Sequence, residues 1–275
     1  MSKLDTLSRF LAEKGPFAVA VSGGVDSMTL AVVAHRENPD TEIFHAVSPA
    51  VPSQATERVQ HYAQKEGWNL KVVEAGEIED PQYVANPANR CYYCKTHLYD
   101  ALSRDTELTV ASGTNTDDLG DYRPGLIAAE EHNVVHPYVE ADIGKDNLRE
   151  IARELELTDL QDLPAAPCLS SRVTTGIAID ADMLPVINEV EQALWEMLQL
   201  HLPLKGVRCR IQPEAISVQI DTSGLLDPLD AYNTETRDIV EQIFSAHGFD
   251  QYLKAISIEP YKRGSAFLID TLTVK

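Results

Sequence analysis

The chain has little positive charge. Its 275 residues include 23 lysines and arginines against 43 aspartates and glutamates, which gives a net charge of −20. Long polyanions such as duplex DNA or tRNA usually require a basic protein face, so this balance argues against a nucleic-acid partner. It is compatible with a small phosphorylated ligand, because a local cluster of arginines can lie inside an acidic envelope.

Signals for export and membrane insertion are also lacking. The stretch MSKLDTLSRFLAEKG is amphipathic and carries acids, without the apolar core or cleavage pattern of a secretion signal. No apolar run reaches the length of a membrane span. We therefore expect a cytoplasmic protein without a membrane partner. In that reducing compartment, the four cysteines are expected to be metal ligands, catalytic thiols or core residues rather than disulfides.

Short apolar runs alternate with longer amphipathic ones over the first 160 or so residues, which predicts strands followed by helices. The expected strands cover residues 17–22, 42–48, 69–76 and 107–114, and the expected helices cover 27–38, 54–67, 93–105, 125–132 and 145–157. The pattern predicts an α/β domain with a mostly parallel sheet flanked by helices. Ligands bind such sheets beyond the carboxyl ends of the strands.

This alternation ends at the proline-containing stretch LQDLPAAPCLSSRVTTG, which has no periodicity and predicts a domain junction or a functional loop. We place the boundary between residues 163 and 164. Beyond it, the sequence predicts a smaller α+β domain, residues 164–275. Its expected elements are helices at 183–200 and 233–249, strands at 206–211 and 216–221, and two further strand-like pieces.

The first strand ends in the stretch SGGVDS, which runs directly into a helix. Gly23 and Gly24 allow a tight turn and a close approach of ligand to backbone. Exposed amides and the helix dipole then favour a phosphate, and Ser22 and Ser27 add hydroxyl donors. Asp26 would repel a phosphate, so we expect it to hold Mg²⁺. The loop lacks the lysine of a Walker motif and the third glycine of a dinucleotide fingerprint; an ordinary strand-to-helix turn is the alternative.

Three of the cysteines are expected to be accessible. Cys91 and Cys94 form a C-x-x-C pair before a helix, and Cys168 lies in the proline-containing loop. Three such thiols suit a [4Fe–4S] cluster with one open iron. The alternative is a structural or redox pair with Cys168 acting alone.

Cys209 differs from these three, because a strand period of two places it with apolar neighbours and predicts a core residue. The same period places Arg208 and Arg210 on the opposite face, where they either meet solvent or bind a phosphate or carboxylate. The eight histidines show no metal-ligand spacing, so we expect them to be packed or solvated.

The stretch SGGVDS resembles the PP-loop of the N-type ATP pyrophosphatases. The segments NPANRCYYCK, ASGTNTDDLGDYRPGLIAAEE and PAAPCLSSRVTTG are similar to corresponding blocks of the LarE family, and the VRCR arginines fit as well. Members of that family are ATP-dependent sulfur transferases that help to build the nickel-pincer nucleotide cofactor of lactate racemase. The resemblance covers most of the chain in the right order.

The resemblance implies a reaction. ATP, with Mg²⁺, would adenylylate one carboxylate of pyridinium-3,5-dicarboxylate mononucleotide, a small-molecule substrate, and a sulfur nucleophile would displace AMP to leave a thiocarboxylate. Some members sacrifice the cysteine that corresponds to Cys168. Others are similar to this chain in having the extra pair, Cys91 and Cys94, and use all three cysteines for a [4Fe–4S] cluster that carries an added sulfide. We favour the cluster route here.

The resemblance also implies roles for residues. Asp26 and Cys168 would be catalytic. The substrate's phosphate or free carboxylate would be bound by Ser171, Arg172, Arg208 and Arg210. ATP and Mg²⁺ would be held by Ser22, Gly23, Gly24, Val25, Asp26, Ser27, Thr114, Asn115 and Asp117. For the last three, a helix-capping turn is the alternative.

Family members tend to form homo-oligomers, which we expect here, with the C-terminal domain serving substrate binding, sulfur transfer and oligomerisation. A PP-loop tRNA thiolase, an amidating PP-loop synthetase and a non-catalytic nucleotide-binding regulator are the other hypotheses.

Overall fold

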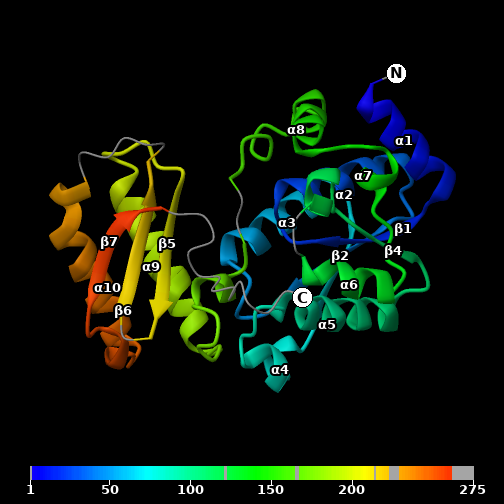
Figure 1. Cartoon of the computed structure of the whole chain (residues 1–275). Coiled ribbons are helices and arrows are strands. Elements are labelled where there is room, and N and C mark those ends of the chain that lie inside the picture. Colours follow the sequence, from blue (N-terminus) through cyan, green and yellow to red (C-terminus); the bar gives the residue numbers. More distant parts are fainter. Residues whose placement is uncertain (1, 121–122, 165–166, 214, 223–228, 262–275) are drawn as a thin grey trace. The chain divides into compact units, whose positions relative to one another are not determined.

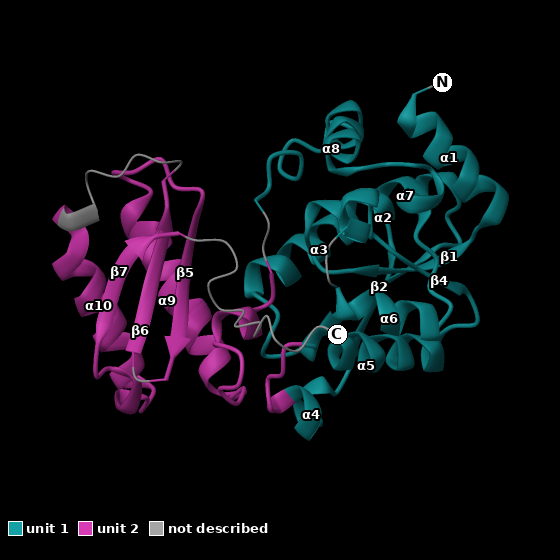
Figure 2. Cartoon of the chain, viewed as in Figure 1, with its two compact units in different colours: residues 1–83, 89–166 teal, residues 84–88, 167–275 magenta. Residues whose placement is uncertain are grey.

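The structure is a computed structural model that describes residues 2–120, 123–164, 167–213, 215–222 and 229–261. The chain divides into two compact units (Figure 2). Unit 1 comprises Met1–Tyr83 and Asn89–Ala166, and unit 2 comprises Val84–Ala88 and Pro167–Lys275.

Unit 1 is built on a parallel four-stranded sheet in the order β3-β2-β1-β4. Its strands are β1 (Phe17–Val21), β2 (Glu42–Val47), β3 (Asn69–Glu74) and β4 (Thr109–Ser112). Each coincides with a strand expected from the apolar runs. Every residue of β1 is buried, as a central strand covered on both faces requires.

Helices cover both faces of this sheet (Figure 1). They are α1 (Lys3–Lys14), α2 (Val25–Glu37), α3 (Ser53–Glu66), α5 (Arg90–Asp105), α6 (Pro124–Glu131), α7 (Pro137–Glu140) and α8 (Lys145–Glu154), with α4 (Pro81–Val84) at the unit boundary and short 3₁₀ turns η1 (Glu77–Glu79) and η2 (Thr116–Gly120). Val19 of β1 packs into the core formed with α1, α2 and α8, and its neighbour Ala18 packs into the core formed with α5 and α6. The expected α/β fold is confirmed.

Unit 2 contains a small mixed sheet. Its elements are η3 (Leu169–Arg172), α9 (Met183–Leu198), β5 (Gly206–Gln212), β6 (Ala215–Asp221), η4 (Leu229–Tyr232), α10 (Asn233–Ala246), η5 (Asp250–Tyr252) and β7 (Ile256–Pro260). β6 pairs antiparallel with β5 and parallel with β7. Leu184, Ile187 and Leu194 give α9 a buried apolar face. β7 is one of the two strand-like pieces expected after residue 249, and residues 262–275 lie outside the described part of the chain.

None of the helices within the described ranges combines the length and the apolar content needed to cross a membrane.

Candidate functional site

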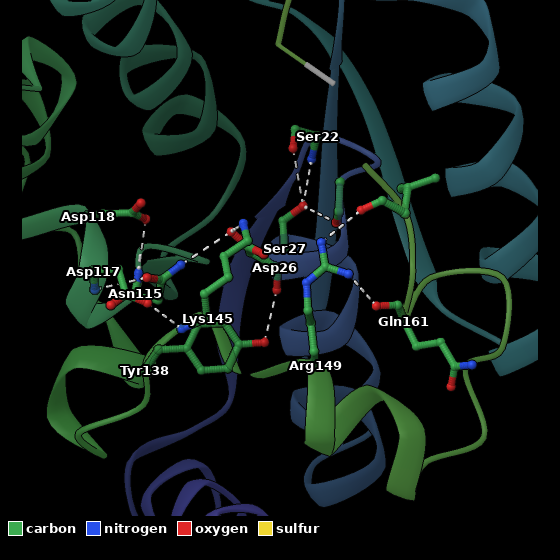
Figure 3. A network of polar contacts seen from close by, with 12 residues as sticks. Ser22, Asp26, Ser27, Asn115, Asp117, Asp118, Tyr138, Lys145, Arg149 and Gln161 are labelled. Carbon is green, nitrogen blue, oxygen red and sulfur yellow. Dashed lines mark hydrogen bonds and ion pairs between the residues drawn. The ribbon is translucent and has the colours of Figure 1, made fainter. Parts of the chain in front are cut away.

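The SGGVDS loop joins β1 to α2 in unit 1 (Figure 3). The Ser22 backbone amide donates to Oγ of Ser27 at 3.1 Å, and that hydroxyl donates to the carbonyl of Gly24 at 3.3 Å. Gly24 is the N-cap of α2 and offers no side-chain acceptor to the first turn of the helix. The loop therefore holds its two serines together at a helix N-terminus that favours anions.

Glycines let neighbouring backbone approach this loop closely. Gly23 has φ +76°, and a Cβ there would lie 2.7 Å from the carbonyl oxygen of Ala55 at the start of α3. From the same helix, Nη1 of Arg58 donates to the Gly23 carbonyl at 2.8 Å. On the other side, a Cβ on Gly113 would lie 2.8 Å from the Ser27 nitrogen. The loop is thus held between α3 and the end of β4.

Asp26 lies at the centre of a polar network (Figure 3). Its Oδ2 accepts from Nζ of Lys145 at 2.8 Å and from Nδ2 of Asn115 at 3.3 Å. Its backbone carbonyl accepts from the Tyr138 hydroxyl at 2.9 Å. Oδ1 is buried and has no hydrogen-bond partner among the described residues. Such an atom is exceptional in a folded protein and points to a group that completes the site.

This orphaned oxygen fits a Mg²⁺ site that substrate completes. Mg²⁺ is usually held by one or two carboxylates, with phosphate oxygens and waters supplying the rest of its octahedron. In either unit, the described residues form no group of three or more histidine, cysteine or acidic side chains placed to hold a metal ion. Asp26 would hold the ion together with oxygens of a bound nucleotide.

Of the three site residues expected after β4, Asn115 contacts Asp26, and the other two lie next to Asn115 in the chain or in the same turn. The side-chain carbonyl oxygen of Asn115 accepts from the Asp117 amide at 3.1 Å. Asp117 in turn accepts from the backbone amide of Lys145 at 2.5 Å, so it caps the start of α8. The Thr114 hydroxyl forms a hydrogen bond with the Ser112 hydroxyl, which also forms one with Nδ1 of His136. Within the turn, the local contact that suits the capping alternative is the one between Asn115 and the Asp117 amide, whereas the bond from Lys145 to Asp117 joins distant segments. Nucleotide binding by the three residues stays a prediction.

Two residues of the network, Lys145 and Tyr138, are not among those that the sequence singles out as site residues. Lys145 is predicted there only as the boundary of the helix expected at 145–157. A signal is present, because a lysine in the first turn of a helix is disfavoured by the helix dipole and calls for a compensating anion. No comparable signal marks Tyr138, which lies in the four-residue helix α7.

The cysteines of the predicted cluster fall in different units. Cys91 is exposed and Cys94 is half-buried in the first turns of α5, whereas Cys168 is half-buried and precedes η3 in unit 2. The spacing of three places Cys91 and Cys94 on one side of the helix. None of the four cysteines, all of which lie in described ranges, forms a disulfide. The units are described separately, so the three-cysteine cluster remains a prediction.

Unit 2 brings the four predicted substrate-binding residues together, and two of them, Arg172 and Arg208, contact the carboxylate of Glu191. Arg172 is buried and makes a two-pronged ion pair with Glu191, at 2.9 Å from Nε and 2.8 Å from Nη2. Burial opposes the charge on Arg172, but the Glu191 carboxylate outweighs it and raises the arginine's pKa. Arg210 donates to the carbonyl of Ser171 at 3.1 Å. Nη1 of Arg208 lies 4.0 Å from the same Glu191.

Two further features of this arginine group bear on the sequence predictions. Cys209 is fully buried, and burial raises the pKa of its thiol, which confirms it as a core residue. Arg210 is buried as well, so the solvated alternative is wrong for it: Nε donates to Gln219 at 2.7 Å within the sheet. Burial lowers the pKa of Arg208 and Arg210, as does the positive charge of Arg172. Three guanidinium groups lie within electrostatic reach of Glu191, and Asp221 also acts on Arg208, which leaves a net positive charge suited to an anion.

Sequence comparison with known proteins gives evidence that is independent of the geometry. No protein-family model matches the chain. It is 39% identical to the "Uncharacterized protein slr1717" of Synechocystis, over 78% of this chain and 83% of the relative. It is 28% identical to pyridinium-3,5-bisthiocarboxylic acid mononucleotide synthase of Lactiplantibacillus plantarum, over 70% and 72% of the two chains. It is 25% identical to a component of the glutamine-hydrolyzing GMP synthase of Thermoplasma acidophilum, over 88% and 89%.

The identity of 39% over most of both chains shows that this protein and the Synechocystis protein are members of one family. The other two relatives are less than 30% identical to this chain, and by their names both are synthases of nucleotides. The chain therefore belongs to the same family as the Synechocystis protein, and its similarity to the two synthases supports a place in the PP-loop ATP pyrophosphatase superfamily.

Proposed function

We propose that the protein is an ATP-dependent sulfur transferase that converts a carboxylate of pyridinium-3,5-dicarboxylate mononucleotide to a thiocarboxylate. The observation that carries the proposal is the orphaned Oδ1 of Asp26, at a glycine loop that suits a pyrophosphate. The similarity to the bisthiocarboxylic acid mononucleotide synthase supports the choice of substrate.

Unit 1 would perform the activation. The amides of the loop and the hydroxyls of Ser22 and Ser27 would bind the β- and γ-phosphates of ATP, and Asp26 would hold Mg²⁺ against them. The ion would offset the negative charge that develops on the departing pyrophosphate. A carboxylate oxygen of the substrate would attack the α-phosphorus as pyrophosphate leaves. The product is an acyl adenylate, whose carbon has AMP as a good leaving group.

Unit 2 would bind the acceptor. Arg208 and Arg210, supported by Ser171, would take the phosphate or the second carboxylate of the substrate, since guanidinium groups match both anions. Arg172 donates to the carbonyl of Cys168 at 3.1 Å, so the cysteine's backbone is tied to the same arginine group. A sulfur nucleophile would then attack the activated carbon, and AMP would leave with the bonding electron pair.

The source of that sulfur has two candidates. We favour a [4Fe–4S] cluster on Cys91, Cys94 and Cys168, which would present a sulfide on its open iron. The alternative is Cys168 itself, whose Cβ–S bond would break to leave dehydroalanine.

An Asp26→Asn variant tests the ATP half of the proposal. It keeps the shape of the side chain but weakens its hold on a cation, so we expect release of AMP and pyrophosphate to fall by at least about 100-fold. The measurement is separation of labelled nucleotides after incubation with substrate. Asp40→Asn, at an exposed aspartate after α2, is the matched control and should retain activity. Release of ADP and phosphate by the unaltered protein would contradict the superfamily chemistry.

Intact-protein mass spectrometry before and after turnover distinguishes the two sulfur sources. An unchanged chain mass, together with bound iron and sulfide in anaerobically purified protein, would support the cluster. A loss of one sulfur atom with its hydrogens would support sacrifice of Cys168.

A further inference from the structure

Lys145 makes a short, charged contact with Asp26. Its ammonium is 2.8 Å from Oδ2, and about two fifths of its side chain is exposed (39%), against 24% for Asp26. The carboxylate charge that a bound divalent cation would neutralise is therefore already neutralised by this lysine.

The backbones of both residues are held by hydrogen bonds, and the Asp26 carboxylate is also held by Asn115. The Lys145 amide is held by Asp117, and the Asp26 carbonyl is held by Tyr138. Lys145 reaches Asp26 through a flexible four-carbon stem that carries a single point charge. Any rearrangement at this pair would therefore be confined to the lysine side chain.

The position of Lys145 has no benefit for its own helix. It is the first residue of α8, where the helix dipole favours anions and disfavours a cation. The N-cap residue, Gly144, has no side chain, and the first amide of the helix is bound by Asp117 instead. Asp26 compensates for this placement, so the lysine is explained by the site rather than by the helix.

From this geometry we propose that Lys145 and a divalent cation compete for Asp26, and that Lys145 transfers from Asp26 to the phosphates when the cation and ATP bind together. This inference rests on the proposed function, because it takes the Asp26 loop as the ATP site. A dication on Asp26 would repel the adjacent ammonium, and the phosphates of an ATP bound to the same dication would offer it new acceptors. Cation alone would then bind poorly, whereas cation and nucleotide would bind as a pair.

Mn²⁺ binding to the full-length protein tests the competition. Free Mn²⁺ is measured by electron paramagnetic resonance, with and without ATP, for the wild type, Lys145→Gln and Lys145→Arg. Lys71→Gln is the matched control, because Lys71 also pairs with a carboxylate at 2.8 Å and is 33% exposed, on β3 away from the loop.

We expect opposite changes in Lys145→Gln. Without nucleotide it should bind Mn²⁺ up to about fivefold more tightly, the range of one partly exposed ion pair. In the presence of Mn²⁺ it should bind ATP more weakly than the wild type. Lys145→Arg and Lys71→Gln should resemble the wild type in both measurements. A merely structural role for Lys145 would weaken both kinds of binding.

Unchanged or weaker Mn²⁺ binding in Lys145→Gln, with circular dichroism and unfolding temperature matching Lys71→Gln, would overturn the inference. If the wild type binds Mn²⁺ with ATP and Lys145→Gln behaves like Lys71→Gln, only this inference fails. If the wild type binds neither ATP nor Mn²⁺ in the presence of ATP, the proposed ATP site is wrong and the inference fails with it.

Discussion

At the scale of single residues, the chain gives its thiols very different surroundings. Cys209 is fully buried in β5, and Val207 and Ile211 of the same strand are buried with it. Burial raises the pKa of this thiol because the thiolate would lose its hydration. Cys91, in unit 1, is exposed. Sequence spacing alone separates Cys209 from the other three cysteines, and its burial supports that separation.

Alkylation checks this difference. When iron-free protein is treated with iodoacetamide at pH 8, we expect Cys91 to be labelled and Cys209 to stay unlabelled until the protein is denatured. The raised pKa keeps Cys209 protonated, and the thiolate is the reactive form. Peptide mass spectrometry identifies the labelled sites. Equal labelling of the two cysteines in the native protein would refute the burial of Cys209.

His45 links stability to pH. Its buried ring donates from Nδ1 to the Val21 carbonyl at 3.0 Å and, when neutral, accepts from Thr56 at 2.9 Å through Nε2. Burial lowers its pKa in the folded state below the ordinary value of 6.5. The folded protein thus binds fewer protons than the unfolded chain, and stability is lost as the pH falls from 6.5 through the folded pKa. The pKa of His136 is lowered by burial too and acts in the same direction.

Urea unfolding at pH 7.5 and pH 5.5 measures this effect. The contribution of one such histidine is at most about 1.4 kcal/mol per pH unit. We expect the wild type to lose more free energy of unfolding on acidification than His45→Gln does. His61→Gln, at an exposed histidine, should lose as much as the wild type. An identical pH dependence in wild type and His45→Gln would contradict the assignment.

At the scale of elements, the loop between β1 and α2 is shaped by its contact with α3. A Gly23→Ala variant places a Cβ 2.7 Å from backbone and in a positive-φ conformation, so the loop must shift. We expect a loss of roughly 1–3 kcal/mol in unfolding free energy and a loss of ATP affinity. Gly67→Ala is the control: its φ is also positive, +69°, but nothing lies within 4 Å of the added carbon. That variant should lose stability while it keeps ATP affinity, as thermal unfolding and nucleotide titration would show.

Elements with a clear period are predictable from sequence, whereas features that depend on distant contacts are not. The strands β1 to β4 and the helices α2, α3, α5, α6 and α8 follow from apolar spacing. The four-residue helices α4 and α7 are too short to show a period. The role of Glu191 is not predicted from sequence. An acid among the apolar positions of α9 does signal a special role, but its partner, Arg172, is known only from the tertiary structure. The Asp26 loop is predicted but its partner Lys145 is not, for the same reason.

At the scale of the whole molecule, the net charge of −20 sets which partners can approach. Repulsion between this charge and a polyanion opposes association once the two approach within a Debye length, about 8 Å at physiological salt, because salt screens the repulsion at larger separations. We expect bulk tRNA to bind with a dissociation constant weaker than about 100 µM at roughly 150 mM salt. A gel-shift titration measures this, with a basic tRNA-binding protein as positive control. Saturable binding at low micromolar concentration would favour the tRNA thiolase hypothesis instead.

The path of the chain between the two units has a consequence for dissection of the protein. Residues 84–88 belong to unit 2 although residues on both sides of them belong to unit 1. Asn86 is fully buried there, and its Nδ2 donates to the carbonyls of Thr174 and Ile177, roughly ninety positions further along the chain. No single cut can separate the units: a fragment ending at residue 163 would keep Asn86 and lose its acceptors. The ribosome likewise completes every strand of the parallel sheet before it delivers the residues that Asn86 requires.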